Sequence, residues 1–345
     1  MTLHQSSAPP ADFGILALGS SLGELRDVAT TAHEYGARPE RVLRLGYRTY
    51  RWAPDDVTCT ELAARAGRVA LARAGVDGAE VDFLLVATGS VPEYLNWDFS
   101  TAVARALRLR GTPTLLLTQG CASAVLAFQQ VAGLFATRQD VRTVLLVAAD
   151  RVDERESNRM RANVESDGAA AVLFRRGHDG MRWLATEQHT DAEYADFFRQ
   201  EYGGTAAPVA PEGRSNRDLD PAHQVYLHFR DDPAGLTKFA GAVDRRVVNA
   251  VTGACKVAGT NVSALSRLIL LNDNRPSMAG IAELLGIPLD RTNADLSGEL
   301  GHAGGADPLI CLDLYREQGT MLPGDLVALA GMSSGMHWFC TLIEV

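Results

Sequence analysis

A glycine–cysteine turn between an apolar run and an amphipathic pattern is the feature that most limits how this chain can fold. Residues 114–117 (Thr-Leu-Leu-Leu) are typical of a strand. Apolar residues at 3.6-residue spacing then predict a helix: Val125, Leu126, Phe128, Val131, Leu134 and Phe135. Gly120 and Cys121 fall at the turn, where unpaired N–H groups and the helix dipole stabilise a thiolate. This segment alone allows two interpretations of Cys121, a nucleophile or a small buried thiol.

Strands and helices alternate along most of the remaining chain. Strands are predicted at 13–19, 81–88, 141–149, 166–174, 267–272, 325–331 and 339–345. Helices are predicted at 60–74, 99–107, 237–258, 278–285 and 309–318. Several strand segments are apolar at successive positions, which indicates burial on both faces. A chain of 345 residues can bury a large core. The pattern therefore predicts a layered α/β fold, and the second half repeats the strand–helix logic of the first.

Residues 185–235 break this alternation, because they are polar and rich in glycine and proline. We interpret them as a long excursion, a lid or an entrance wall, with helix near 191–202. His223 and His228 lie in it, where they are either solvated or line an acceptor pocket.

Composition limits the class of protein. The net charge of −9, with only two lysines, argues against nucleic acid as the main partner. No apolar run reaches the roughly 18 residues of a membrane span, and residues 1–12 form a short tail without a secretory signal pattern. The five cysteines are widely spaced without a zinc pattern, so we expect a reduced, cytoplasmic protein without a bound metal.

Four motifs follow one another along the chain: the Cys121 turn, Ser-Asp-Gly-Ala at 166–169, Gly301-His302, and the loop at 331–338 before a final strand. In this order, from about residue 13 to the end, the chain resembles the thiolase-fold ketosynthase III enzymes. The resemblance implies a five-layered α/β/α/β/α fold of two related halves, 1–176 and 177–345, in a homodimer. It also implies that Cys121 accepts an acyl group from coenzyme A or from the phosphopantetheine of an acyl carrier protein, without a tightly bound cofactor. The implied oxyanion donors are the backbone N–H groups of Cys121 and Ser334.

The chain departs from the condensing members of that family. Their His and Asn stabilise the enolate of a decarboxylated malonyl group. Here Leu271 stands at the His position, with Asn272 as the nearest alternative, and His302 stands at the Asn position. Leucine donates no hydrogen bond and asparagine carries no proton at neutral pH, so the decarboxylating machinery is absent or rebuilt.

Residues 301–307 (Gly-His-Ala-Gly-Gly-Ala-Asp) fit the Gly-His-x-Gly-x-x-Asp loop of ketosynthase-III-like acyltransferases of antibiotic and polyketide pathways. By this resemblance, Cys121 passes its acyl group to a hydroxyl of a sugar or polyketide, an amine or a second carrier. His302 is the expected base. Asp307 orients His302, caps the helix that begins near Pro308, or does both at once. Asp273 is a second candidate carboxylate, unless it faces away or pairs with Arg275.

Two other functions stay open: a condensing enzyme that uses His302 in place of the lost pair, and an inactive partner of a true ketosynthase. The arginines at 151–161 form a solvated helix face or a docking patch for an acidic carrier or for CoA phosphate. Asn96 and Trp97 are expected near the acyl group. Core or packed loop positions are predicted for Cys59, Cys255, Cys311, Cys340, His337 and Trp338.

Overall fold

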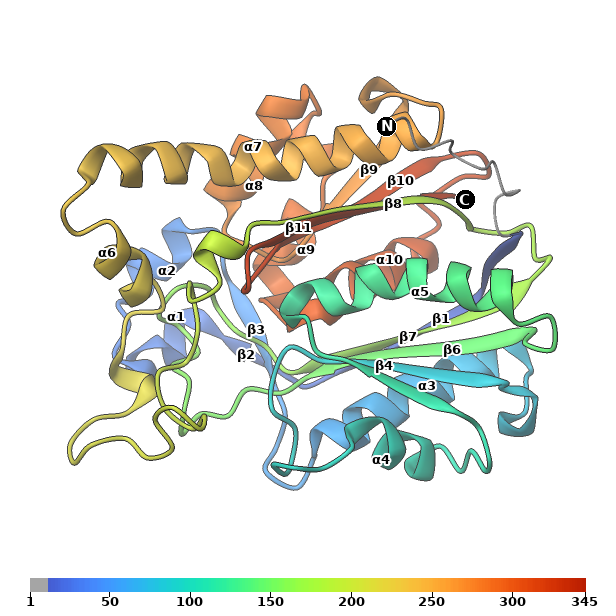
Figure 1. The fold of residues 1–345 in the computed structure, drawn as a ribbon, viewed down its shortest axis with the longest axis horizontal. Coiled ribbons are helices and arrows are strands. Elements are labelled where there is room, and N and C mark those ends of the chain that lie inside the picture. Colours follow the sequence, from blue (N-terminus) through green and yellow to red (C-terminus); the bar gives the residue numbers. More distant parts are fainter. Residues whose placement is uncertain (1–11) are drawn as a thin grey trace, which may run out of the picture.

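The computed structural model describes residues 12–345, and the predicted tail at 1–12 lies almost entirely outside them. Nine strands are hydrogen-bonded in the order β5-β4-β6-β7-β1-β8-β11-β10-β9. Between β1 and β8 only Gly14 and Arg182 pair, so the sheet divides there into two stacked layers (Figure 1). The lower layer holds β1 (Phe13–Leu22), β4 (Phe83–Ala87), β5 (Thr114–Leu117), β6 (Thr143–Asp150) and β7 (Gly168–Arg176). The upper layer holds β8 (Arg182–Thr190), β9 (Leu265–Leu270), β10 (Leu326–Ser333) and β11 (His337–Glu344).

Helices complete a five-layered α/β/α/β/α arrangement (Figure 1). Below the lower sheet lie α3 (Cys59–Ala74) and α4 (Phe99–Ala106). Above the upper sheet lie α7 (Pro233–Val257) and α8 (Arg275–Leu285). Between the sheets lie α5 (Ser123–Thr137) and α10 (Asp307–Glu317). The predicted fold class is therefore confirmed, while the division into halves at 176/177 stays a prediction.

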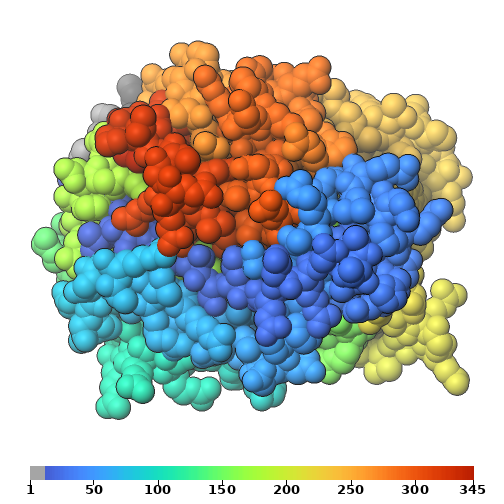
Figure 2. Space-filling view, turned by 180° about the vertical axis from the view of Figure 1, so that it is seen from behind, coloured from blue at the N-terminus to red at the C-terminus, as the bar shows by residue number. Residues whose placement is uncertain are grey.

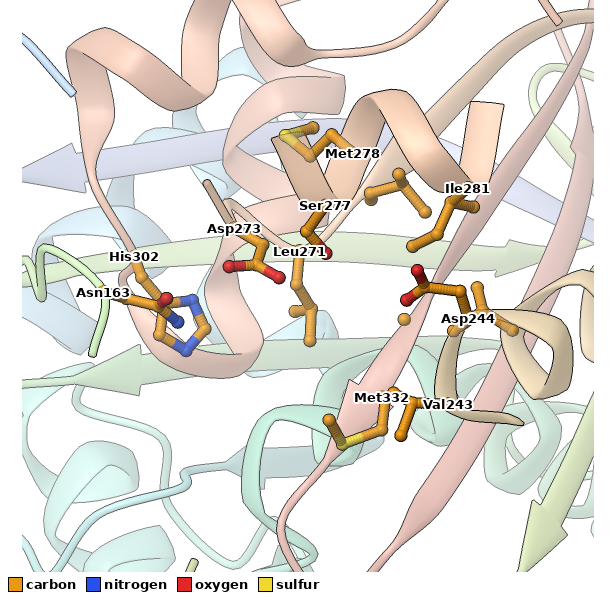
Figure 3. Close-up of a pocket in the computed structure, with 13 residues that line it drawn as sticks. Asn163, Val243, Asp244, Leu271, Asp273, Ser277, Met278, Ile281, His302 and Met332 are labelled. Atoms are coloured by element: carbon orange, nitrogen blue, oxygen red, sulfur yellow. The ribbon is translucent and has the colours of Figure 1, made fainter. Parts of the chain in front are cut away.

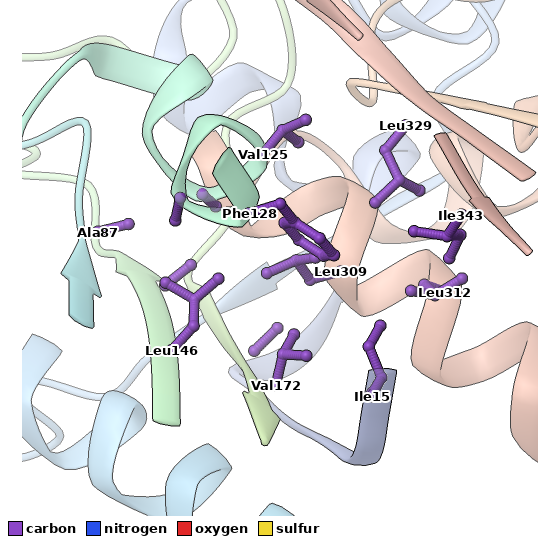
Figure 4. Packing of buried hydrophobic residues seen from close by; sticks show 14 of the residues in the cluster. Ile15, Ala87, Val125, Phe128, Leu146, Val172, Leu309, Leu312, Leu329 and Ile343 are labelled. Atoms are coloured by element: carbon purple, nitrogen blue, oxygen red, sulfur yellow. The ribbon is translucent and has the colours of Figure 1, made fainter. Parts of the chain in front are cut away.

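The central helices form the core of the molecule. Phe128 of α5 and Leu309 of α10 are fully buried and pack with side chains from both sheets (Figure 4). Because sheets cover α5 on two sides, residues 122–128 are buried without interruption rather than along one stripe. Residues Gly120–Thr137 are apolar and long enough for a membrane span by composition, and in the described chain they are this core helix.

The excursion is shorter than predicted. β8 occupies 182–190, so irregular structure begins at 191. Polar residues fill the last five positions of β8, 186–190, and the final three of them are exposed, which is why the sequence there resembles a loop. The helix predicted at 191–202 is wrong, because only the 3₁₀ turn Ala192–Tyr194 forms. Farther on, α6 (His223–His228) adds a short helix, and the Tyr194 and Phe197 rings pack against Phe239 of α7.

Other elements have no predicted counterpart. The polar segment 23–59 contains a two-stranded sheet of β2 (Glu24–Asp27) and β3 (Thr49–Trp52), with α1 (Val28–Thr31) and α2 (Pro39–Arg44). α9 (Ala294–Leu300) leads into the histidine loop. The predicted loop at 332–338 shrinks to a turn at 334–336, since β10 and β11 extend toward each other as a hairpin.

Candidate active site

Cys121 lies in the 3₁₀ turn Gly120–Ala122 between β5 and α5, and it is the one partly exposed cysteine among residues 12–345. The four others are buried as predicted, and burial raises the pKa of each of these thiols. Gly120 has φ +57°, and a Cβ there would lie 2.4 Å from Ser333 Oγ. A glycine is therefore needed to place Cys121 against the β10–β11 turn.

The structure brings His302 and Asp307 to Cys121. The sulfur lies 3.4 Å from His302 Nε2, and His302 Nδ1 lies 2.5 Å from Asp307 Oδ2. A carboxylate at Nδ1 fixes the ring orientation and directs Nε2 toward the sulfur. The three side chains are hydrogen-bonded in a row, with Cys121 as nucleophile, His302 as base and Asp307 as the acid that orients the base.

Asp307 does not cap α10, so that alternative is wrong. It is the first residue of the helix, whose N-cap position is Ala306. Its buried carboxylate turns back, where it accepts from Ala303 N–H at 2.6 Å and from Asn272 N–H at 2.9 Å, besides contacting His302. These bonds hold the acid in one orientation.

His302 is favoured in its charged form. Burial by itself disfavours the imidazolium, but the Asp307 carboxylate and the Cys121 sulfur outweigh it and raise the pKa of His302 well above its usual value. A cation next to the sulfur stabilises a thiolate.

The Ser-Asp-Gly segment holds the histidine loop. His302 N–H donates to Val164 C=O, and Ser166 N–H donates to His302 C=O, both at 2.7 Å. Ser166 Oγ also donates to Leu300 C=O at 2.5 Å. Buried Asp167 next to it pairs with buried Arg159 at 3.2 Å. The sequence showed this motif only through the family resemblance, since nothing local reveals that 164–166 would pair with residue 302.

Asp150 is a functional candidate that the sequence analysis missed. This buried residue ends β6, and its Oδ1 accepts from Gly89 N–H at 2.8 Å and from Ser90 Oγ at 3.0 Å. Its Oδ2 accepts from Gly305 N–H at 3.1 Å. Burial raises the pKa of Asp150 to about 6. The carboxylate therefore connects the 88–90 loop to the histidine loop.

Asp273 is not in the hydrogen-bonded line. Its Oδ1 accepts from Asn274 N–H at 2.7 Å and Nδ2 at 2.8 Å, and no contact joins it to His302 or Arg275 within the hydrogen-bond or ion-pair limits. It lines a cavity of about 120 Å³ together with His302 and Leu271 (Figure 3). Asn272 is fully buried and points instead toward Asp307 and Gly301 C=O. Leu271 thus occupies the position that faces the cavity.

The predicted oxyanion residue Ser334 lies beside the cysteine turn. A Cβ on Gly120 would lie 2.8 Å from Ser334 Oγ, and Ser333 Oγ donates to Gln119 C=O at 3.1 Å. The β10–β11 turn is therefore next to Cys121, and the direction of the Ser334 N–H stays a prediction.

The remaining candidates divide between surface and core. Residues 151–161 form no helix, contrary to prediction, and Arg159 is buried, while Arg155 pairs with Asp153 at 2.8 Å. Asn96 and Trp97 line a second cavity of about 370 Å³. His337 accepts from or donates to Thr190 Oγ1 at 2.8 Å, and Trp338 is buried as predicted. Between residues 12 and 345, no group of three His, Cys, Asp or Glu side chains is placed to hold a metal.

A cysteine on a strand–helix turn, faced by a histidine loop between two stacked sheets, defines a thiolase-fold protein. Two family models match the chain: 3-oxoacyl-[acyl-carrier-protein] synthase III over residues 117–192, and its C-terminal part over 255–345. These matches support a ketosynthase-III-like protein.

Similar proteins agree with this assignment. The chain is 27% identical over 307 residues to an acetoacetyl CoA synthase, NphT7, of Streptomyces sp. (strain CL190), covering 87% of this chain and 88% of the relative. It is 26% identical over 310 residues to a beta-ketoacyl-[acyl-carrier-protein] synthase III of Trichormus variabilis, covering 87% and 88%.

Solved structures share the fold. The acyltransferase ChlB3 superposes with a TM-score of 0.84 at 22% identity, covering 97% of this chain and 98% of that one. The 3-oxoacyl-[acyl-carrier-protein] synthase III of Aquifex aeolicus superposes with a TM-score of 0.78 at 19% identity, covering 96% and 100%.

Proposed function

We propose that the protein is an acyltransferase that carries an acyl group on Cys121 from a thioester to a heteroatom acceptor. The observation that carries the proposal is the line from Cys121 Sγ through His302 to Asp307, at 3.4 and 2.5 Å. This arrangement supplies a nucleophile and a base with its orienting acid.

In the first half-reaction the Cys121 thiolate attacks the carbonyl of a CoA or carrier-protein thioester. A new carbon–sulfur bond forms, the bond to the pantetheine sulfur breaks, and the departing thiolate takes the proton from His302 Nε2. The backbone N–H groups of Cys121 and Ser334 are the proposed donors to the tetrahedral oxyanion. Two cavities, one lined by Asn96 and Trp97 and one lined by His302, are the proposed spaces for the acyl group and the acceptor.

In the second half-reaction neutral His302 accepts the proton of an acceptor O–H or N–H. The acceptor oxygen or nitrogen bonds to the acyl carbon, and the bond to Cys121 breaks. The imidazolium and the thiolate are thereby restored, in accord with the raised pKa of His302.

Carbon–carbon condensation is the second candidate, favoured by the activities that the names of the relatives state. Against it stands Leu271, whose apolar side chain lines the cavity beside His302 and cannot stabilise an enolate. Carbon dioxide release from malonyl thioester separates the two functions.

We infer a homodimer in the cytoplasm. β5 is an edge strand, and four large apolar side chains on or near it are exposed: Val91, Tyr94, Leu95 and Leu115. An apolar edge of this kind is ordinarily covered by a partner. A second copy of the chain is the occupant that the family resemblance implies.

The test is intact-mass spectrometry after incubation with a panel of acyl-CoA and acyl-carrier thioesters. We expect one acyl mass on the unmodified protein and none on Cys121→Ala, and slower loading of His302→Ala. Full loading of Cys121→Ala would contradict the proposal. Failure of every thioester to load would favour an inactive ketosynthase-like partner.

A further inference from the structure

The cavity beside His302 has an uneven lining. Elements α7, α8, β9 and β10 enclose about 120 Å³, and most of the lining is apolar. The His302 ring is at one end, Asp273 lies next to it, and Asp244 of α7 projects from the opposite side (Figure 3). Any molecule that approaches His302 through this space meets two carboxylates.

Neither carboxylate is neutralised by the chain. Asp244 makes no ion pair or side-chain hydrogen bond within the described residues, and Asp273 is bonded only to neutral Asn274. No lysine or arginine lines the cavity. The positive charge of His302 is already balanced by Asp307. The cavity therefore carries an excess of negative charge next to His302.

The raised pKa of Asp244 agrees with this picture. Burial and the nearby charge of Asp273 both raise the pKa of Asp244. A carboxylate whose charged form is disfavoured by burial and by a neighbouring negative charge gains from a bound cation.

We propose that Asp244 and Asp273 bind an ammonium group of the acyl acceptor, so that the acceptor is a small hydroxylated amine such as an amino sugar. The inference rests on the proposed acyl transfer and names the substrate class for it. The ammonium is held by the two carboxylates, while Ser277 and Asn163 offer polar contacts to neighbouring hydroxyls. The apolar remainder of the lining accepts the carbon skeleton.

The transfer step balances with this acceptor. A hydroxyl of the amine, placed at His302, gives its proton to Nε2 while its oxygen bonds to the acyl carbon. The carbon–sulfur bond breaks, and Cys121 leaves as the thiolate. The ammonium keeps its proton throughout, since its task is binding. An anionic malonyl group in the same space would be repelled by both carboxylates.

The experiment compares the rates at which three methanethiosulfonates, which share one reactive group and differ in charge, label the complete protein. Cationic 2-aminoethyl methanethiosulfonate, neutral methyl methanethiosulfonate and anionic 2-sulfonatoethyl methanethiosulfonate are each reacted with it. Intact-mass spectrometry follows the label, with Cys121→Ala as the blank, because the other four cysteines are buried. The variants are Asp244→Asn and, as a matched loss of one surface charge, Asp290→Asn, which lies outside the cavity and is exposed.

We expect the cation-to-anion rate ratio at Cys121 to exceed that of free cysteine by about tenfold or more. Asp244→Asn should lower this ratio severalfold, and Asp290→Asn should leave it unchanged. A ratio equal to that of free cysteine, or one unaffected by Asp244→Asn, would overturn the inference.

A second measurement separates acceptor binding from donor binding. With the thioester that best loads the protein, acylation of Cys121 is compared between Asp244→Asn and the unmodified protein, and acylation that is no slower in the variant assigns the carboxylates to the acceptor. If acylation slows by the same factor as the cation-to-anion rate ratio falls, the carboxylates bind the donor, and the inference is overturned. If no thioester loads Cys121, the proposed acyl transfer fails, whereas the charge ratio still reports on the cavity.

Discussion

Asn272 holds Asp307 by two hydrogen bonds, from its backbone N–H to Oδ2 at 2.9 Å and from its Nδ2 to Oδ1 at 3.2 Å. Asn272 thus holds Asp307, the carboxylate that orients His302, and does not line the cavity. Its own oxygen accepts from Asn293 Nδ2 at 2.9 Å, so the support continues into the core.

Truncating Asn272 should affect both stability and activity. Asn272→Ala removes the side-chain donor to a buried carboxylate, which we expect to cost roughly 2–3 kcal/mol of unfolding free energy. The released Asp307 should also orient His302 less well, so acylation of Cys121 should slow. Urea unfolding and intact-mass kinetics measure the two effects. Asn261→Ala is the matched control with little expected change, because Asn261 is exposed and, within residues 12–345, its side chain hydrogen-bonds only with Ser263.

Removing the Asp307 charge should move the pH dependence of Cys121 reactivity. Asp307 raises the pKa of His302. Asp307→Asn should therefore lower the pKa of His302 and leave little of its imidazolium form at neutral pH. Alkylation by iodoacetamide at pH 7 should then slow by about tenfold or more, and its pH profile should shift to higher pH. An unchanged profile would show that Asp307 does not control the proton on His302.

Asp150 should give the protein a measurable pH-dependent stability. Its pKa rises from 3.8 to about 6 on folding. The folded state therefore binds the proton more tightly, and the stability it contributes is full below about pH 4 and is lost as pH rises through about 6. The difference in unfolding free energy between the unmodified protein and Asp150→Asn should fall by roughly 2.5 kcal/mol between pH 4 and pH 7. A difference that is constant with pH would contradict the shift.

Gly304 tests the contact between Asp150 and the histidine loop. It has φ +59°, and a Cβ there would lie 2.1 Å from Asp150 Oδ2. Gly304→Ala should therefore displace the loop, lower acylation of Cys121 and cost more than about 2 kcal/mol. Gly319→Ala is a matched control, because Gly319 has φ +65° but open space around its Cβ position. It should cost about 1 kcal/mol from the backbone alone and leave acylation unchanged. Equal effects of the two variants would show that the contact with Asp150 is unimportant.

Segments with strong periodicity were predictable from sequence. The run at 114–117 appears as β5, although as an edge strand with Leu115 exposed, and the helix after Cys121 appears as the largely buried α5. β8 and the 23–59 segment were not predicted correctly. Their residues are largely polar, and their strands form because partner strands lie alongside.

The sequence by itself determined the layered fold, because its strands and helices alternate. It also determined the candidate catalytic residues, because Cys121 and the 301–307 loop are local patterns. Only the tertiary structure decided what they do to one another. Residues 121 and 302 are 181 positions apart, and their contact depends on the stacking of two sheets around α5 and α10. The same packing turned Asp307 away from its helix end, left Asp273 in the cavity wall with Asp244, and enclosed Asp150 between two loops, since long-range contacts have no signature in local periodicity.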